Sequence, residues 1–242
     1  MHWLNEFLKF CRPVSRLTGS EWADAKRFIS LGTTAEPGPW RTYRTPYLQE
    51  PMDAATDKET EKVVLMFASQ VGKSEMLLNI LGYYADQEPS PQLMLQPTVE
   101  MAQAFSKERI APMFRDSPGL AGKLIEGKEG RGTEKKSSTT ILMKHYSGGF
   151  LALVGANSPA GLASRPIRIL LADEVDRYPE SAGKEGDPLK LAVQRTQNFG
   201  NRKLLMVSTP TVVGYSKIHN EFLAGDQREF VVQCRNETST TS

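Results

Sequence analysis

A Gly-Lys-Ser tripeptide at positions 72 to 74 stands between a short apolar run and a run with helical spacing. A glycine there lets the backbone approach a phosphate group closely, and the free N–H groups and positive dipole end of the following helix attract the anion. Lys73 would reach the β- and γ-phosphates of a nucleoside triphosphate, and the Ser74 hydroxyl would bind Mg²⁺. The phosphate-binding loop, or Walker A motif, would consist of Gln70, Val71, Gly72, Lys73 and Ser74.

Phe67 departs from the usual form of this loop, in which a glycine stands five positions before the Gly-Lys-Ser glycine. A Gly-Lys-Ser tripeptide can also occur at any strand-to-helix turn. By itself, therefore, the tripeptide leaves a nucleotide site and a chance occurrence both open.

An acidic pair, Asp173-Glu174, directly follows the apolar run Ile-Leu-Leu-Ala. This is the Walker B pattern, in which Asp173 would hold the Mg²⁺ shell and Glu174 would orient or deprotonate the attacking water. The pair could instead cap a following helix, because acidic residues are common at helix starts. Since both motifs stand at predicted strand ends, we interpret them together as a nucleoside triphosphate site, and the carboxylate after Asp173 indicates hydrolysis.

Hydroxyl groups follow a third apolar run, in the sequence Ser-Thr-Pro-Thr at positions 208 to 211. Ser208 and Thr209 could sense the γ-phosphate and pass its loss to the rest of the molecule. They could equally cap a turn, and this motif is weak on its own.

Short apolar runs alternate with segments of helical spacing over most of the chain. They predict strands at 62–68, 92–97, 139–146, 149–156, 167–174, 203–210 and 228–234, and helices at 20–30, 73–86, 98–114, 187–199 and 215–225. The alternation predicts an α/β fold, with a mainly parallel sheet and helices on both faces. In such sheets ligands bind beyond the carboxyl ends of the strands, where all three motifs are expected.

The composition bounds the class of protein. The chain has 242 residues, of which 39% are hydrophobic and 24% charged, which suits one domain with an N-terminal helical appendage at 1–45. A net charge of +2 is too small to indicate nucleic-acid binding. Two cysteines and three histidines are too few for a disulfide framework or a zinc cluster. No apolar run is long enough for a membrane span, so we expect a cytosolic protein.

Six stretches in order carry a family resemblance: RTPYLQEPMDA, ASQVGKSE, LQPT, SRPIRILLADEVDRYP, EGDPLKLAVQRT and STPT. With them, the chain from about residue 40 to 234 resembles the ATPase domain of the phage terminase large subunit of the GpA family. The resemblance implies an ASCE-type P-loop NTPase fold over 46–234. Terminases of this kind lack the first loop glycine, so Phe67 no longer counts against the site.

The resemblance also implies roles for individual residues. Lys73 and Glu174 would be catalytic, Ser74 and Asp173 would hold Mg²⁺, and Ser208 and Thr209 would form the coupling motif. Tyr47 is similar to the aromatic residue that packs on adenine, with Gln49 nearby, although it could be an ordinary aromatic in a proline-flanked turn. Arg165 is similar to the arginine that some terminases supply to a neighbouring subunit's γ-phosphate, although it could be merely exposed or face DNA. Ser69 stands where other terminases place an arginine inside the loop.

The implied function is ATP hydrolysis coupled to translocation of double-stranded DNA into a procapsid, in the cytoplasm of the host bacterium. The implied partners are the terminase small subunit and the portal, on which such subunits form a homo-oligomeric ring; in isolation we expect a monomer or weak oligomer. We expect no nuclease domain after residue 234 and a disordered tail at 235–242, so no DNA cleavage by this chain is expected. The alternative is a truncated, non-catalytic terminase remnant that acts as an interaction module. A two-domain helicase is a less favoured interpretation, because it would need a second motor lobe with its own motifs and these 242 residues are too few for one.

Possible DNA contacts lie in a polar loop at 126–136. Its basic residues are Lys128, Arg131, Lys135 and Lys136. Because glutamates are interleaved with them, a solvated loop is the favoured interpretation.

Overall fold

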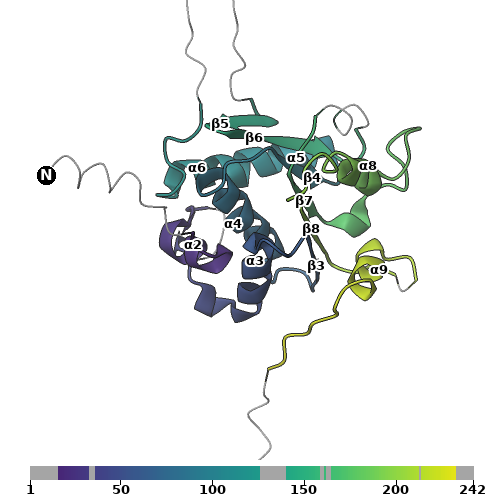
Figure 1. Cartoon of the computed structure of the whole chain (residues 1–242), viewed down its shortest axis with the longest axis horizontal. Helices are drawn as coiled ribbons and strands as arrows, with labels where there is room; N and C mark the ends of the chain where they lie inside the picture. The colour runs from purple at the N-terminus through teal and green to yellow at the C-terminus, as the bar shows by residue number, and fades with distance from the viewer. Residues whose placement is uncertain are drawn as a thin grey trace, which may run out of the picture.

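A six-stranded sheet forms the centre of the molecule in the computed structural model, which describes residues 16–32, 36–125, 140–158, 161, 165–212 and 214–232 (Figure 1). Its strand order is β3-β8-β7-β4-β6-β5. All neighbouring strands are parallel except β5 and β6, which form an antiparallel hairpin. The strands in this order are Lys62–Met66, Lys203–Ser208, Ile169–Asp173, Gln92–Gln96, Gly149–Gly155 and Met143–Tyr146. The predicted α/β, mainly parallel fold is confirmed.

Helices cover both faces of this sheet. One face carries α2 (Gly19–Lys26), α3 (Gln49–Thr56), α4 (Lys73–Asp86), α5 (Val99–Phe105) and α6 (Ala111–Asp116), and the other carries α8 (Pro188–Gln194) and α9 (Lys217–Leu223) (Figure 1). Successive strand residues point to opposite faces. Leu171 and Leu205 therefore belong to the core under α4, whereas Leu170 and Leu204 belong to the core under α8 and α9. Burial on both faces explains why these strands are continuous apolar runs.

Helix α2 packs directly on α4. It begins at a capping box formed by Thr18 and Glu21 and ends at Lys26. Trp22 is fully buried in the core that α4 also lines, and its ring lies against Gly82. The helix predicted at 20–30 is thus shorter than expected, because the chain turns into β1 (Phe28–Ile29), which pairs with β2 (Gly38–Pro39).

Two further predictions differ from the structure. The helix predicted at 98–114 is continuous but contains a π-helical turn, η3 (Ser106–Ile110), between α5 and α6. The strand predicted at 228–234 is wrong for its described part, since residues 228–232 form no strand. That segment leaves the sheet, and Phe230 packs against Tyr47 instead. The 126–136 loop, with its lysines and arginine, and the 235–242 tail lie outside the described residues.

Three short 3-10 turns lie between the helices and strands of the described residues. They are η1 (Thr42–Arg44), η2 (Pro46–Leu48) and η4 (Val175–Arg177). Within the described part of the chain, none of the helices has the length and apolar character needed to cross a bilayer.

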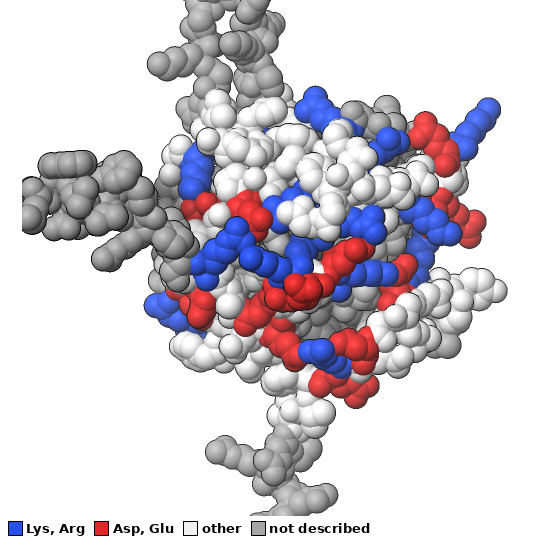
Figure 2. All heavy atoms as spheres, in the orientation of Figure 1, with Lys and Arg blue, Asp and Glu red and all other residues white. Residues whose placement is uncertain are grey.

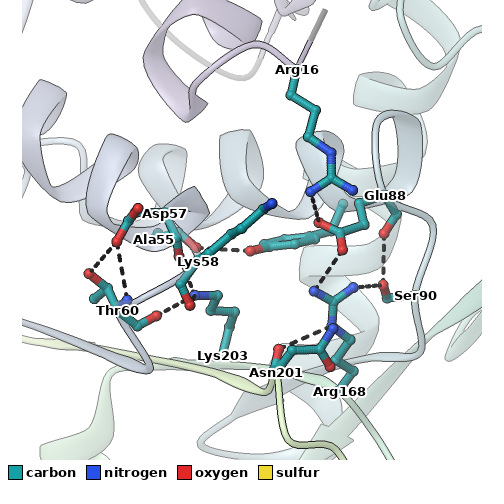
Figure 3. Close-up of polar contacts among 11 residues, drawn as sticks. Arg16, Ala55, Asp57, Lys58, Thr60, Glu88, Ser90, Arg168, Asn201 and Lys203 are labelled. Carbon is teal, nitrogen blue, oxygen red and sulfur yellow. Dashed lines mark hydrogen bonds and ion pairs between the residues drawn. The ribbon is translucent and has the colours of Figure 1, made fainter. Parts of the chain in front are cut away.

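The amino end of the sheet is closed by two buried cations (Figure 3). Arg168 donates to Ser90 Oγ at 2.8 Å, pairs with Glu88 at 2.9 Å and lies over the Tyr84 ring. Lys203 donates to backbone carbonyls of the turn between α3 and β3, and burial lowers its pKa. Since buried charges are tolerated when they are paired or hydrogen-bonded, both cations fasten this end of the sheet.

Candidate nucleotide-binding site

The three sequence motifs meet at the carboxyl ends of the neighbouring strands β3, β8 and β7. Lys73 Nζ donates to Thr209 Oγ1 at 2.9 Å and to the Ala68 carbonyl at 2.5 Å. Ser74 Oγ donates to Asp173 Oδ2 at 3.0 Å. The structure therefore brings the loop, the acidic pair and the hydroxyl segment into direct contact.

The loop between β3 and α4 has a backbone that suits close approach of an anion. Gly72 has a φ of 85°, in the left-handed region, and a Cβ there would lie 3.2 Å from Leu48 Cδ1. Gln70 also has a positive φ of 60°, which is uncommon for a residue with a side chain. Helix α4 begins directly after Gly72, so its first unpaired N–H groups face the loop.

Phe67 holds the start of this loop through a backbone hydrogen bond and a ring contact. Its N–H donates to the Ser208 carbonyl at 3.2 Å, which continues the pairing of β3 with β8 by one residue. Its ring meets the Tyr47 ring edge-on, with centroids 6.0 Å apart. The Tyr47 hydroxyl in turn donates to the Val71 carbonyl at 3.1 Å, so one aromatic pair holds both ends of the loop.

Tyr47 thus lies beside the phosphate-binding loop. Its ring is half-buried and also contacts Phe230, with centroids 5.9 Å apart. Gln49 is exposed at the start of α3. The role of either residue in binding adenine stays a prediction.

Asp173 is buried and keeps one oxygen without a partner. Oδ2 accepts from Ser74 and from Gln96 Nε2, the latter at 3.3 Å, whereas Oδ1 has no hydrogen bond to any described residue. Burial raises the pKa of Asp173, against the opposing effect of the bonds from Ser74 and Gln96. A buried carboxylate with a free oxygen beside a serine hydroxyl is a fitting set for Mg²⁺.

No group of three or more histidine, cysteine or acidic residues that could hold a metal occurs among the described residues. A Mg²⁺ ion at Ser74 and Asp173 would therefore take its other ligands from phosphate oxygens and water, as is common for this ion.

Glu174 stands at a strained position at the edge of the site. Its φ is 55°, and backbone outliers of this kind concentrate at functional sites. Its carboxylate pairs with Arg177 Nε at 3.5 Å, and the Arg177 side chain is 65% exposed. Exposed pairs are weak, so Glu174 can leave Arg177 at little cost.

Arg165 is not part of this constellation. Its guanidinium lies over the Phe150 ring, 5.7 Å from the centroid, near the start of β6 and thus at the amino end of the sheet. It is exposed there and cannot serve the site of its own subunit without a large movement. Its action on a neighbouring subunit stays a prediction.

Two residues of the site were not singled out from the sequence. Gln96 ends strand β4 and bonds to Asp173, and the strand-end rule that identified Asp173 could have identified it. Asp176 connects the turn after β7 to the segment after β8, and no spacing rule indicates this contact.

Comparison with known proteins gives a family match over most of the chain. The sequence model of the family "Phage terminase large subunit gpA, ATPase domain" matches residues 34–238. The terminase large subunits of Enterobacteria phage P21 and Escherichia phage lambda are each 27% identical to this chain over 203 residues, or 84% and 83% of its length. The chain spans about 30% of the length of these two relatives.

Solved structures give a likeness of fold. A mutant of the Thermus phage P74-26 large terminase ATPase domain is 18% identical, with a TM-score of 0.50 over 74% of this chain and 69% of that chain. A second structure of that domain has a TM-score of 0.49 and is 16% identical, covering 71% of this chain and 68% of that chain.

Proposed function

The chain belongs to the family of the phage terminase large subunit gpA ATPase domain, and we propose that it is the ATP-hydrolysing motor domain of a DNA-packaging terminase. The observation that supports this proposal most is the meeting of Lys73 with Thr209 and of Ser74 with Asp173. Phosphoryl transfer needs a cradle for the triphosphate, a metal site and a residue that positions water, and the loop with Lys73, the Ser74–Asp173 pair and Glu174 would supply these three in turn.

The roles of the residues follow from their positions. Lys73 and the loop N–H groups would bind the β- and γ-phosphates. Ser74 and Asp173 would hold Mg²⁺, which when bound neutralises charge on the phosphate oxygens. Glu174 would accept a proton from water as the water oxygen bonds to the γ-phosphorus and the bond to the β-phosphate oxygen breaks, which gives ADP and phosphate.

Further residues would bind the adenine ring or act at the site of a neighbouring subunit. Tyr47 would pack on adenine, with Gln49 nearby. Arg165 would stabilise the transition-state charge at the site of an adjacent subunit in a ring, where its exposure at the far end of the sheet makes it available.

Translocation of double-stranded DNA into a procapsid is the proposed use of this hydrolysis. Ser208 and Thr209 would couple the two, and the proposed partners are the terminase small subunit and the portal, in the cytoplasm of the host bacterium. In the view of Figure 2, lysine and arginine side chains are mixed with acidic ones and form no separate basic surface. A motor that moves along DNA needs contacts to the backbone, not to base edges, and a few such cations would suffice.

The test is steady-state ATP hydrolysis by the purified chain with Mg²⁺, with and without linear duplex DNA. Glu174→Ala should bind ATP but hydrolyse it about 10² to 10⁴ times more slowly, because that is the usual contribution of a general base to the rate. Lys73→Ala should lose ATP binding. Glu185→Ala, a change at an exposed acid in the turn before α8, is the matched control and should behave as the parent chain does.

Unchanged turnover in Glu174→Ala would refute the assignment of this residue. Absence of both turnover and ATP binding in the parent chain, by calorimetry, would refute the motor proposal and favour an interaction module.

A further inference from the structure

The Asp176 carboxylate gathers hydrogen bonds from two separate segments. Oδ2 accepts from the Thr211 N–H at 2.9 Å and from the Thr211 hydroxyl at 3.0 Å. Oδ1 accepts from the Ile218 N–H at 2.8 Å. Burial acts to raise the pKa of Asp176, but the bonds from Ile218, Ser216 and Thr211 outweigh it and lower the pKa, so the group is an ionised acceptor at neutral pH.

One side of this contact leads to the phosphate-binding loop. The Asp176 N–H donates to Ser208 Oγ at 3.1 Å, and Ser208 Oγ donates to the Thr209 carbonyl at 3.1 Å. Thr209 Oγ1 accepts the hydrogen bond from Lys73. A short chain of hydrogen bonds therefore runs from the lysine that would bind the γ-phosphate to Asp176.

The other side leads to α9. Ile218 lies in the first turn of this helix, where N–H groups have no partner inside the helix, and its side chain is fully buried in the core under α8 and α9. The ion pair of Lys62 with Glu221, both partly exposed, is a second contact that joins α9 to β3. Helix α9 is thus held to the same strands whose ends carry the site.

We propose that Asp176 is a positioning residue that links occupation of the phosphate-binding loop to the placement of α9. The inference rests on the proposed ATP hydrolysis. A bound triphosphate would draw Lys73 Nζ from Thr209 Oγ1 to phosphate oxygens, which frees the end of β8 to shift. Because Asp176 binds both Thr211 and Ile218, that shift reaches α9, and movement of α9 in turn changes the Walker B turn that carries Glu174.

Asp176→Asn tests the link with little change in shape. The amide can accept on one side only, and its NH₂ group would face either the Thr211 or the Ile218 N–H, donor against donor. Thr211→Val is a milder variant. It removes the hydroxyl bond alone and leaves the cap on Ile218 in place.

Asp57→Asn is a matched control, because Asp57 has the same kind of partners at the other end of the sheet (Figure 3). Its Oδ2 accepts from the Glu59 N–H at 3.1 Å and from the Thr60 N–H and hydroxyl, both at 3.2 Å. It closes the turn between α3 and β3 and touches no residue of the nucleotide site.

The experiment measures ATP affinity by calorimetry, kcat and KM, and hydrogen exchange of α9 with and without a non-hydrolysable ATP analogue. In the parent chain the analogue should change exchange in α9. Asp176→Asn should bind ATP as the parent does and show no analogue-dependent change in hydrogen exchange of α9. Its kcat should fall about 10²-fold, which is the usual effect of a small misplacement of catalytic groups. Thr211→Val should lose on the order of tenfold in kcat with α9 exchange normal in the absence of nucleotide.

Three results would overturn the proposal. If Asp176→Asn and Thr211→Val keep the parental kcat, Asp176 is a helix cap only. If Asp57→Asn loses as much kcat as Asp176→Asn does, the effect is general destabilisation. In both cases the parent chain still hydrolyses ATP and the proposed function stands; a parent chain that binds no ATP would remove both.

Discussion

Replacing Phe67 with glycine restores the usual loop sequence, and the structure predicts that this change harms the protein. Phe67 is half-buried against the core, so glycine forfeits about half of the 1.5–3 kcal/mol that full burial of such a side chain supplies. It also loses the edge-on contact with Tyr47, worth about 0.5–1.5 kcal/mol. Glycine in an extended segment costs roughly a further 0.5–1 kcal/mol in backbone entropy. The expected loss of stability is about 2–4 kcal/mol.

The same change should weaken ATP binding. The Phe67–Tyr47 pair fixes the loop at both ends, since Tyr47 also bonds to the Val71 carbonyl. Without the pair, ATP binding itself must order the loop. If that ordering costs about 1 kcal/mol, ATP affinity falls roughly fivefold. Phe67→Leu keeps an apolar side chain and loses the ring pair, so it should lose about 1 kcal/mol of stability.

Urea unfolding and calorimetry with ATP measure both quantities on one preparation. A Phe67→Gly chain that is as stable as the parent and binds ATP equally well or better would refute the reasoning. Phe67 would then be a neutral substitution in a loop that needs no brace.

Two other predictions concern the contact of α2 with α4. Gly82→Ala places a Cβ 2.3 Å from an atom of the Trp22 ring, so overpacking should lower the free energy of unfolding by about 1–3 kcal/mol, seen as a lower urea midpoint; an unchanged midpoint would show that Trp22 moves freely. Asp86 accepts from Trp22 Nε1 and from two lysines, and these bonds outweigh burial and hold the pKa of Asp86 below 3.8. Its contribution is therefore full above the unfolded-state pKa and is lost as pH falls towards the lower native value. Asp86→Asn should lose less stability between pH 7 and pH 3 than the parent chain does, and equal losses would contradict the assignment.

The sequence sufficed to predict that Lys73, Ser74, Asp173 and Thr209 lie close together, because a single rule covers them. Each follows a short apolar run, and the carboxyl ends of parallel strands share one edge of the sheet. The rule needs only the existence of the strands, so errors of a few residues at their ends do no harm.

Contacts that depend on strand order and on turn geometry could not be predicted in this way. The Phe-Val-Val run within 228–234 has the residue types of a strand, but strand preference reflects packing against neighbours, and here Phe230 packs on Tyr47. Asp176 is also a case of this kind. Its partners Thr211 and Ile218 come close only because β7 and β8 are neighbours and because η4 turns the carboxylate towards them.

The two ends of the sheet differ in how their buried charged groups are paired. At the amino end, the charges of Arg168 and Lys203 are met by carbonyls, a hydroxyl and a carboxylate, so both buried cations have partners. At the carboxyl end, Asp173 holds an oxygen without a partner among the described residues, and Glu174 sits in a costly backbone conformation. Folding alone gives no reason to keep both defects side by side. A bound cation and an aligned water would use them, which supports the proposal that hydrolysis takes place at this end of the sheet.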